Sequence, residues 1–313
     1  MLDTEDVQDV AVGPNRRPGR LRAGRGIFVL PPLALVVALL LGPLVLIALY
    51  SFGLRSNIPG AATSLDTSNW KDFLTGSGNT FRGLLWHSLG ITLLVSVAAT
   101  VAAYPLAYFL SFVARKHRYT LLLLLLAPFF TSYLLRVIAW QVILNDNGVA
   151  NSFIQAIGLR PQGEAVPWLI YSNFAVALVL FYSWIPFVAL PIFAVLENMD
   201  RRLLEAAEDL GASRTATFLR VTLPLSLPGV IAGFVFVLIP TTGEFITPLL
   251  VGGTDSQLFG NAIQSFFVDS PDWNYGSVLA LTLITLVVAL TLVFGRFLMT
   301  DLREPEPERG AGK

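Results

Sequence analysis

The chain has 313 residues, of which 54% are hydrophobic and 13% are charged, and its mean hydropathy is +0.67. Soluble domains carry roughly twice that share of charged residues, so the composition excludes an ordinary soluble protein and indicates an integral membrane protein. The 21 basic and 21 acidic residues balance, which gives no indication of nucleic-acid binding, and the lack of cysteine excludes disulfides, thiolate metal sites and a cysteine nucleophile.

Six segments are long and apolar enough to span a membrane, since a spanning helix needs about 20 mostly apolar residues. They cover approximately residues 27–50, 89–113, 119–144, 168–196, 227–251 and 275–298. No period-two alternation typical of a membrane β-barrel accompanies them, so we expect an all-α polytopic fold. The polar ends, residues 1–26 and 301–313, are predicted to be disordered cytoplasmic tails around a transmembrane domain of residues 27–300.

Basic residues and tryptophans predict the same orientation for these spans. Of the 21 Lys and Arg residues, 16 lie in the tails and in the second–third and fourth–fifth connections, and 4 lie in the opposite connections. The positive-inside rule therefore places both termini in the cytoplasm. Four tryptophans lie at the predicted outer ends of spans, as an aromatic belt requires: Trp86, Trp140, Trp168 and Trp273.

The inner connection between the fourth and fifth spans, residues 197–226, is long and has a helical pattern of its own. Asp200 and Ser213 are favoured N-cap residues, and Gly211 is of the type that follows a helix C-terminus, so we expect two short helices. Apolar residues recur on one face of the first helix at Leu203, Ala207 and Leu210. The connection is therefore predicted to place an amphipathic helix at the cytoplasmic membrane face.

The charges of this first helix permit two interpretations. Glu205, Glu208 and Asp209 could form a solvated face, with Arg201 and Arg202 placed four and three residues before Glu205 to pair with it. Alternatively the acidic face contacts a partner protein, because it disfavours anionic lipid and because two arginines in the first turn oppose the helix dipole. We favour the partner interpretation.

The stretch EAAEDLGASRTATFLRVTLP within this connection resembles the EAA loop of ABC-importer permeases. That motif is Glu-Ala-Ala, three residues, Gly, nine residues, an aliphatic residue, any residue, Leu and Pro. The matching residues here are Glu205, Ala206, Ala207, Gly211, Val221, Leu223 and Pro224, with Val221 where Ile is usual. Over residues 25–300 the chain resembles the spermidine/putrescine type of these permeases, most clearly at 131–153, 184–198 and 239–253.

The resemblance implies a permease subunit of an ATP-driven importer in a bacterial inner membrane, with polyamines as cargo. It implies a second, homologous permease, two ATP-binding cassette ATPase subunits and an extracytoplasmic substrate-binding protein as partners. The implied ATPase-coupling residues are Glu205, Ala206, Ala207, Asp209, Gly211, Leu223 and Pro224. By the same resemblance, the outer segment 147–153 meets the binding protein. The chain lacks a phosphate-binding GxxxxGK[ST] loop, so ATP hydrolysis is expected in partner subunits, with no catalytic residue, cofactor or metal here.

Arg136 and Glu244 are the two ionisable residues inside the predicted spans, and both lie about five residues outward of the middle of their span. Each costs about 2.5–3.5 kcal/mol near the bilayer centre, so each needs a partner or a wet path. Two interpretations remain: an ion pair between them, or a carboxylate at Glu244 that lines the translocation path or gate and meets an ammonium cargo. Thr242 and Gly243 weaken the helix before Glu244, which favours a path.

Two prolines, Pro186 and Pro191, lie inside the fourth predicted span and each removes a backbone hydrogen bond. They are read either as a packing kink or as a hinge for alternating access. The aromatic residues Tyr182 and Trp184 lie beside them, as core or lipid contacts or as a cation–π surface on the path.

Competing functions remain open at this point. An importer for another small organic solute, such as an opine, an amino-acid derivative or a phosphonate, would share the same architecture. A stand-alone secondary transporter would need an inverted repeat and several intramembrane carboxylates, and neither is evident in the sequence. A membrane enzyme would need a pair of catalytic residues within the membrane-spanning segments. Substitution of Glu205 or Gly211 separates these classes, since only an importer depends on a coupling loop.

Overall fold

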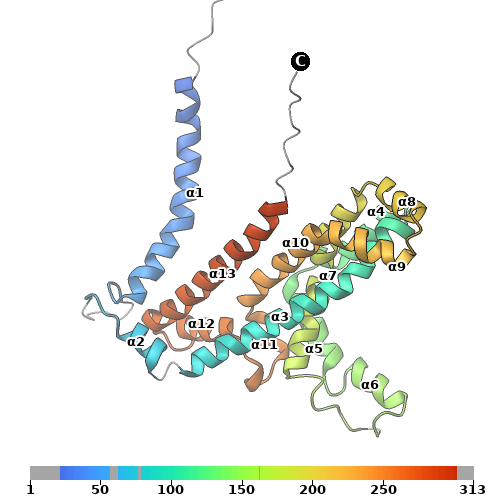
Figure 1. Ribbon diagram of the computed structural model, residues 1–313. Helices are drawn as coiled ribbons and strands as arrows, with labels where there is room; N and C mark the ends of the chain where they lie inside the picture. The colour runs from blue at the N-terminus through green and yellow to red at the C-terminus, as the bar shows by residue number, and fades with distance from the viewer. Residues whose placement is uncertain (1–21, 57–62, 77–78, 162, 302–313) are drawn as a thin grey trace, which may run out of the picture. The chain divides into compact units, whose positions relative to one another are not determined.

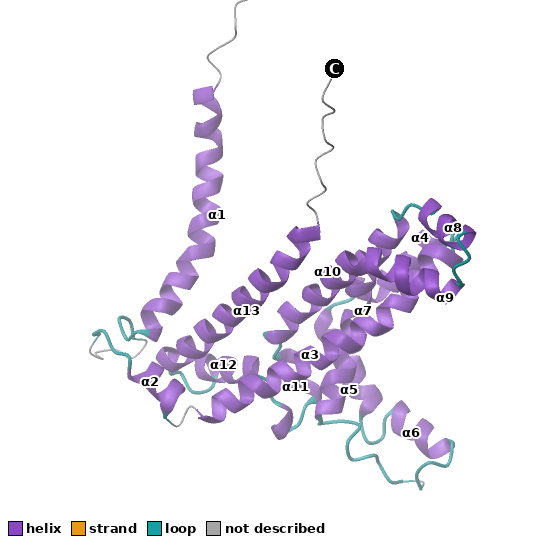
Figure 2. Cartoon of the chain, viewed as in Figure 1, coloured by secondary structure: helices purple, strands orange, loops and turns teal. Residues whose placement is uncertain are grey.

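The computed structural model describes residues 22–56, 63–76, 79–161 and 163–301. The described residues form helices and their connections, with no strand among them (Figure 2). The expected all-α class is therefore confirmed. By length and composition, five described helices could cross a membrane, or six if one sharply bent pair counts as a single span.

The chain divides into two units, residues 1–46 and 47–313. The first unit contributes most of α1 (Arg22–Ser51), whose residues 31–41 are all exposed within the chain. Because α1 begins at Arg22, the last five residues of the expected N-terminal tail are helical, which corrects that prediction. The remainder of the two expected tails, residues 1–21 and 302–313, lies outside the described residues.

The core of the second unit consists of three long helices that pack side by side (Figure 1). They are α3 (Asn79–Tyr108), α7 (Asn173–Glu197) and α10 (Leu223–Thr242). A π-helical turn, η1 (Phe109–Val113), extends α3, and another, η3 (Phe218–Thr222), precedes α10. Ser172 Oγ accepts a hydrogen bond from the amide of Ala175 at 3.1 Å, so α7 begins five residues later than the expected span.

Small residues allow these three helices to approach closely. Ala99, Ala103 and Ala107 are fully buried at four-residue intervals on α3. On α10, a Cβ added to Gly229 would lie 2.8 Å from the carbonyl oxygen of Pro191, and one added to Gly233 would lie 2.9 Å from that of Val188. In a bilayer, where helix association rests on van der Waals packing, such contacts specify which helices pair.

The third expected span, residues 119–144, is not one helix. It divides into α4 (Arg118–Leu126), the 3₁₀ turn η2 (Ala127–Phe130) and α5 (Tyr133–Leu144), with a bend of 87° at the break. Thr131 and Ser132 have extended backbone with ψ of 154° and 137°. Pro128 cannot donate a backbone hydrogen bond, and the Thr131 hydroxyl donates to its carbonyl at 2.6 Å, so local bonds replace the helical ones.

The fifth expected span, residues 227–251, is broken as well. The helix α10 ends at Thr242, and a new short helix, α11 (Ile246–Val251), follows after three residues. The predicted weakening at Gly243 is thus a complete interruption, and a continuous span was the wrong expectation. The helices α5 and α11 pack against each other. Tyr133 and Thr247 share a 2.6 Å hydrogen bond, and Gln141 Nε2 donates to the Leu250 carbonyl at 2.8 Å.

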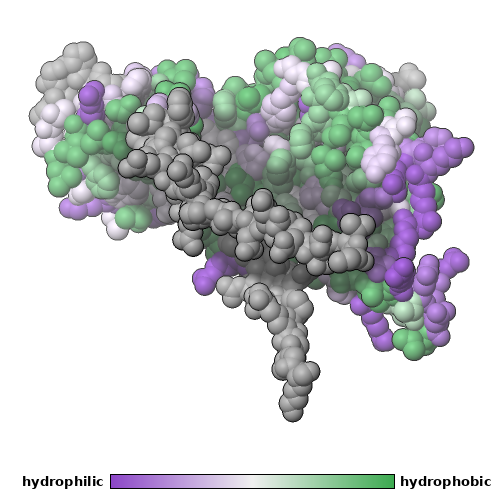
Figure 3. Space-filling model, turned by 90° about the horizontal axis from the view of Figure 1, so that it is seen from above, coloured by the Kyte–Doolittle hydropathy of each residue, from purple (hydrophilic) through white to green (hydrophobic). Residues whose placement is uncertain are grey.

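The remaining elements lie at the two ends of the second unit (Figure 1). One end carries α2 (Ser68–Thr75), α6 (Val149–Ala156), η4 (Thr254–Ser256), α12 (Phe259–Val268) and the start of α13 (Trp273–Asp301). The other end carries α8 (Arg202–Asp209) and α9 (Arg214–Thr217). In Figure 3, apolar side chains cover much of the visible surface and hydrophilic ones gather at the side where α8 and α9 lie. This distribution fits helices immersed in lipid with polar ends in water.

Candidate functional site

The connection between α7 and α10 folds into two short helices, as the pattern predicts. Ser213 Oγ accepts a hydrogen bond from the amide of Ala216 at 3.3 Å, which confirms it as a cap. Asp200 Oδ1 accepts from the amide of Arg202 at 3.0 Å, and α8 begins one residue later than expected. Gly211 has a φ of +82°, a left-handed conformation that glycine adopts without strain. The turn at Gly211 therefore fixes the direction in which the chain leaves α8.

The helix α8 presents its side chains outward. None of its residues is buried, and three of the expected coupling residues, Glu205, Ala206 and Asp209, are exposed. Leu210, directly after the helix, is 89% exposed. An exposed leucine beside carboxylates on a short helix is typical of a surface that a partner covers. Of the other expected coupling residues, Ala207 is half-buried in the same helix.

Leu223 and Pro224 belong to a different element. They form the first turn of α10, where Leu223 is half-buried and Pro224 is exposed. Proline is well suited to this position because its missing amide has no helical acceptor there. These two residues therefore set the start of α10, and the structure does not bring them into the exposed face of α8.

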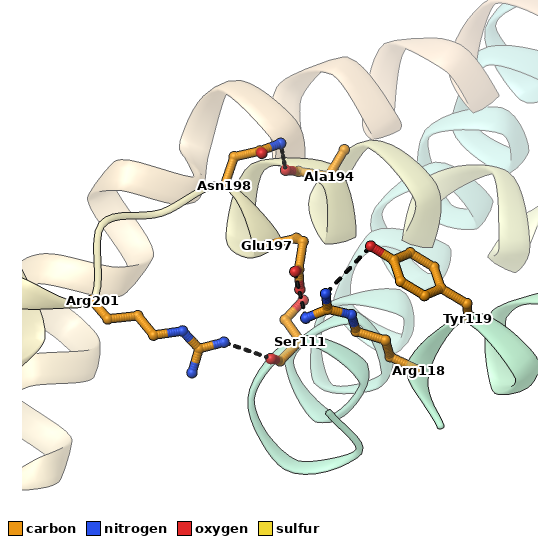
Figure 4. A network of polar contacts seen from close by, with 7 residues as sticks. All are labelled: Ser111, Arg118, Tyr119, Ala194, Glu197, Asn198 and Arg201. Carbon is orange, nitrogen blue, oxygen red and sulfur yellow. Dashed lines mark hydrogen bonds and ion pairs between the residues drawn. The ribbon is translucent and has the colours of Figure 1, made fainter. Parts of the chain in front are cut away.

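Arg201 does not pair with Glu205, contrary to one of the sequence interpretations. Its Nη2 donates to the carbonyl oxygen of Ser111 at 3.3 Å (Figure 4). Its guanidinium lies 5.4 Å from the ring centre of Phe112. Within the described residues the ion pairs are Arg118–Glu197 and Arg160–Glu164. Among the described residues, the acidic side chains of α8 form no ion pair, which leaves their charge available to a partner.

A cavity of about 450 Å³ lies between the two broken spans and α7. Its lining residues are Phe129, Thr131, Tyr133, Arg136, Ser183, Trp184, Phe187, Glu244 and Ile246. It thus collects three of the residues that the sequence singles out, Arg136, Trp184 and Glu244. Tyr182 lies instead at a neighbouring hollow of about 300 Å³ that also contains Pro186.

Glu244 caps the helix α11. Its Oε1 accepts hydrogen bonds from the amides of Ile246 at 2.9 Å and Thr247 at 3.1 Å. A carboxylate at a helix N-terminus satisfies otherwise free amides and is stabilised by the helix dipole. Thr242 is buried and its hydroxyl donates to the Leu238 carbonyl at 2.6 Å, whereas Gly243 ends α10. The break between α10 and α11 and the capping carboxylate of Glu244 therefore belong to one local structure.

Arg136 and Glu244 line the same cavity but form no ion pair within 4.0 Å. Arg136 Nη2 donates to the Thr131 carbonyl at 3.3 Å, and the guanidinium lies 4.2 Å from the ring centre of Phe129. Arg136 is only 9% exposed, and its Nε has no hydrogen-bond partner in the described part of the chain. The cavity thus presents one cation and one anion on different walls, among aromatic rings.

Several lining residues were not predicted. Phe129 and Tyr133 reach the cavity because the third span breaks at Thr131 and bends, which hydropathy does not reveal, and Phe187 lines it from α7. The sequence does contain a signal for the Glu244 cap of α11. Pro248 follows Glu244 by four residues, and proline favours the first turn of a helix. The two prolines of α7 lie within one continuous helix, and the Pro191 carbonyl packs against Gly229.

Comparison with known proteins agrees with this architecture. The family described as "Binding-protein-dependent transport system inner membrane component" matches residues 117–300, more than half of the chain. The spermidine/putrescine transport system permease protein PotB of Escherichia coli (strain K12) is 36% identical over 213 residues, which cover 68% of this chain and 76% of that protein. The inner membrane ABC transporter permease protein YdcU of the same strain is 31% identical over 307 residues, covering 89% and 94%.

A solved structure shares the fold. The bacterial alginate ABC transporter, determined in complex with an alginate pentasaccharide-bound periplasmic protein, superposes with a TM-score of 0.69 over 90% of this chain and 96% of that one, at 13% identity. Together with the matched family and the apolar helices, these similarities identify a multi-pass protein of the bacterial inner membrane with a transport role. The chain belongs to the binding-protein-dependent transport system inner membrane components, the permease subunits of ABC importers.

Proposed function

We propose that this permease imports polyamines, with putrescine or spermidine as cargo. The single observation that supports this cargo most strongly is the 36% identity to a spermidine/putrescine permease over 68% of the chain. In the proposed assembly the chain forms the translocation path with a second, homologous permease. Two ATP-binding cassette subunits hydrolyse ATP on the cytoplasmic side, and an extracytoplasmic binding protein delivers the amine.

The cavity beside Glu244 has chemistry that suits such a cargo. A polyamine is a flexible methylene chain with ammonium groups, and Glu244 is the acidic residue among the lining side chains. Trp184, Phe187 and Phe129 offer aromatic faces that can contact methylene groups or attract an ammonium. The helix break at Gly243 exposes backbone at this depth, which is tolerated only beside protein or a water-filled path. We therefore assign the cavity to the translocation path.

Arg136 on the same cavity favours a second cargo class. A guanidinium binds carboxylate and phosphonate groups well, so an amino-acid derivative with one ammonium and one carboxylate is the alternative. In the polyamine interpretation, Arg136 has a structural role instead, held between the Thr131 carbonyl and the Phe129 ring.

For energy coupling we propose that α8 fits a cleft in an ATPase subunit. The exposed carboxylate of Glu205 and the exposed Leu210 are the contacts expected to transmit ATP-driven movement. Gly211 then orients the chain toward α9 and α10, with Leu223 and Pro224 fixing where the membrane helix begins.

The deciding experiment is uptake of labelled putrescine and spermidine by proteoliposomes that contain the complete complex, ATP and the binding protein. Glu205→Arg serves as the coupling-deficient control and Glu205→Gln as the size-matched variant. We expect uptake of at least one amine and its loss in Glu205→Arg with the complex still assembled. No uptake of either amine, together with uptake of an amino-acid derivative, would refute the polyamine cargo and retain the importer. Uptake that Glu205→Arg leaves unchanged would refute the coupling role.

A further inference from the structure

Three charged residues form a cluster where α8 joins the membrane helices, and we name Arg118, Glu197 and Arg201 the exchange cluster (Figure 4). Glu197 is the last residue of α7, Arg118 is the first residue of α4, and Arg201 directly precedes α8. Arg118 Nη1 lies 2.5 Å from Glu197 Oε1. The cluster therefore connects three elements: the core helix, the start of the broken third span, and the proposed coupling helix.

The cluster is largely shielded from water. The side chains of Arg118 and Glu197 are 24% and 20% exposed. Arg201 lies over Phe112 and donates one hydrogen bond to the carbonyl of Ser111, both in η1 at the end of α3. An ion pair in such surroundings is screened less than a surface pair, and removal of one partner leaves the other charge poorly solvated.

Two charged atoms of the cluster are left without partners. Glu197 Oε2, an acceptor, and Arg201 Nη1, a donor, are both buried and make no hydrogen bond in the described part of the chain. Buried polar atoms are nearly always paired, so each such atom calls for an explanation. These two are chemically complementary, and their residues are four positions apart, one at the end of α7 and the other directly before α8. The present arrangement thus leaves an ion pair unmade between residues that are close in the chain.

We propose that Glu197 exchanges arginine partners during transport, from Arg118 in the arrangement seen here to Arg201 when α8 is displaced. This inference rests on the proposed coupling role of α8. The two arrangements use the same carboxylate, and each leaves one arginine without it, which makes the cluster a two-state element of the kind that carries conformational coupling.

The exchange has a direct route to the cargo cavity. Arg118 starts α4, and the 3₁₀ turn that continues α4 carries Phe129, which lines the cavity and holds Arg136 at 4.2 Å. Release of Arg118 from Glu197 removes the ion pair that ties this segment to α7. Movement of α8 on ATP hydrolysis would then alter the wall of the cavity. Glu197 and Arg201 are thus positioning residues for coupling, and neither touches cargo.

The first test separates the charge of Arg201 from its anchoring hydrogen bond. Gln at position 201 can still donate to the Ser111 carbonyl but cannot form an ion pair with Glu197, whereas Lys keeps the charge. We expect Arg201→Gln to assemble and retain basal ATP hydrolysis, but to lose about tenfold in hydrolysis stimulated by the loaded binding protein. We expect Arg201→Lys to retain most of the stimulation. The matched control is Arg115→Gln, because Arg115 is exposed, lies outside α8 and forms neither of these ion pairs.

The second test uses disulfide formation to detect the displacement of α8 that the exchange requires, and the absence of native cysteine gives a clean background. The double variants Arg118→Cys/Glu197→Cys and Glu197→Cys/Arg201→Cys are compared in the complete complex without nucleotide and after trapping with ATP and vanadate. We expect the two pairs to respond in opposite directions, one crosslinking faster and the other more slowly in the trapped state. Crosslinking rates that do not change with state would overturn the exchange.

These outcomes are distinct from failure of the proposed function. If Glu205→Arg uncouples the importer but Arg201→Gln behaves like Arg115→Gln, the exchange is wrong and the coupling role of α8 survives. If Glu205→Arg also has no effect, the coupling role fails first. Equal losses of stimulation in Arg201→Gln and Arg201→Lys would show that Arg201 acts through shape and not through charge, which also refutes the exchange.

Discussion

The hydroxyl groups of Tyr133 and Thr247 share a hydrogen bond of 2.6 Å, which joins α5 to α11. Each of these helices is the second part of a broken span, and the bond connects their first turns beside the cavity. The two interruptions are therefore one structural unit, in which each short helix is held by the other.

Removal of the Tyr133 hydroxyl tests how much its hydrogen bond to Thr247 stabilises the pairing of α5 with α11. Tyr133→Phe keeps the ring and removes the bond to Thr247, so we expect a loss of about 1 kcal/mol in the free energy of unfolding. Thermal unfolding of the purified permease complex measures the loss. Tyr171→Phe is the control, since Tyr171 is 55% exposed. Equal melting temperatures for the two variants would mean that the bond does not stabilise the pair.

The close packing of α10 on α7 predicts a difference between two glycine substitutions. In Gly233→Ala the new methyl group would lie 2.9 Å from the backbone oxygen of Val188, so the helices must separate, at a cost of about 1–3 kcal/mol. Gly90→Ala in α3 meets nothing within 4 Å, and alanine favours a helix over glycine, so it should be neutral or stabilising. Melting temperatures of the two variants provide the comparison, and a Gly233→Ala protein as stable as Gly90→Ala would argue against the packing described here.

Glu244 has two roles that substitution can separate. Glu244→Gln keeps an oxygen that can accept from the amides of Ile246 and Thr247, so we expect near-normal stability but reduced uptake of a cationic cargo. Glu244→Ala removes the cap as well, and we expect a further loss of about 1 kcal/mol in stability.

Measurement of uptake and thermal unfolding on the same preparations distinguishes the two roles. Normal polyamine uptake by Glu244→Gln would exclude a direct role of the charge in transport and leave the cap as the function of this residue.

Gly211 offers a matched pair at the end of α8. Its φ of +82° strains residues with a Cβ atom, although a Cβ there would meet no other atom within 4 Å. We expect Gly211→Val to redirect α8 and to abolish binding-protein-stimulated ATP hydrolysis, because a β-branched residue disfavours this conformation. Gly211→Asn should retain most of the activity, since asparagine tolerates left-handed backbone. Similar activity in the two variants would show that the backbone conformation at 211 is not required for coupling.

The sequence by itself determined the class of the protein. Apolar segments of spanning length and the lack of charge required helices in a bilayer, since only there can so many apolar side chains remain outside a core. Local patterns also predicted the connection that carries α8, because Ser213 and Gly211 act through the conformation of their own backbone. The motif around Glu205 identified the family for a similar reason, since its constraints are confined to twenty neighbouring residues.

Only the tertiary structure decided what surrounds the charges. Hydropathy sums over a window and does not register that the third span bends by 87° at Thr131, so Phe129 and Tyr133 were absent from the predicted site. Sequence spacing allowed Arg201 to pair with Glu205, but the end of α3 offers a carbonyl and an aromatic ring that direct its side chain elsewhere. Arg136 and Glu244 line the same cavity without an ion pair, and Glu244 Oε1 accepts hydrogen bonds from the amides of α11 instead. The placement of Arg201 and the pairing of the two broken spans around the cavity depend on contacts between residues distant in sequence, which no local pattern contains.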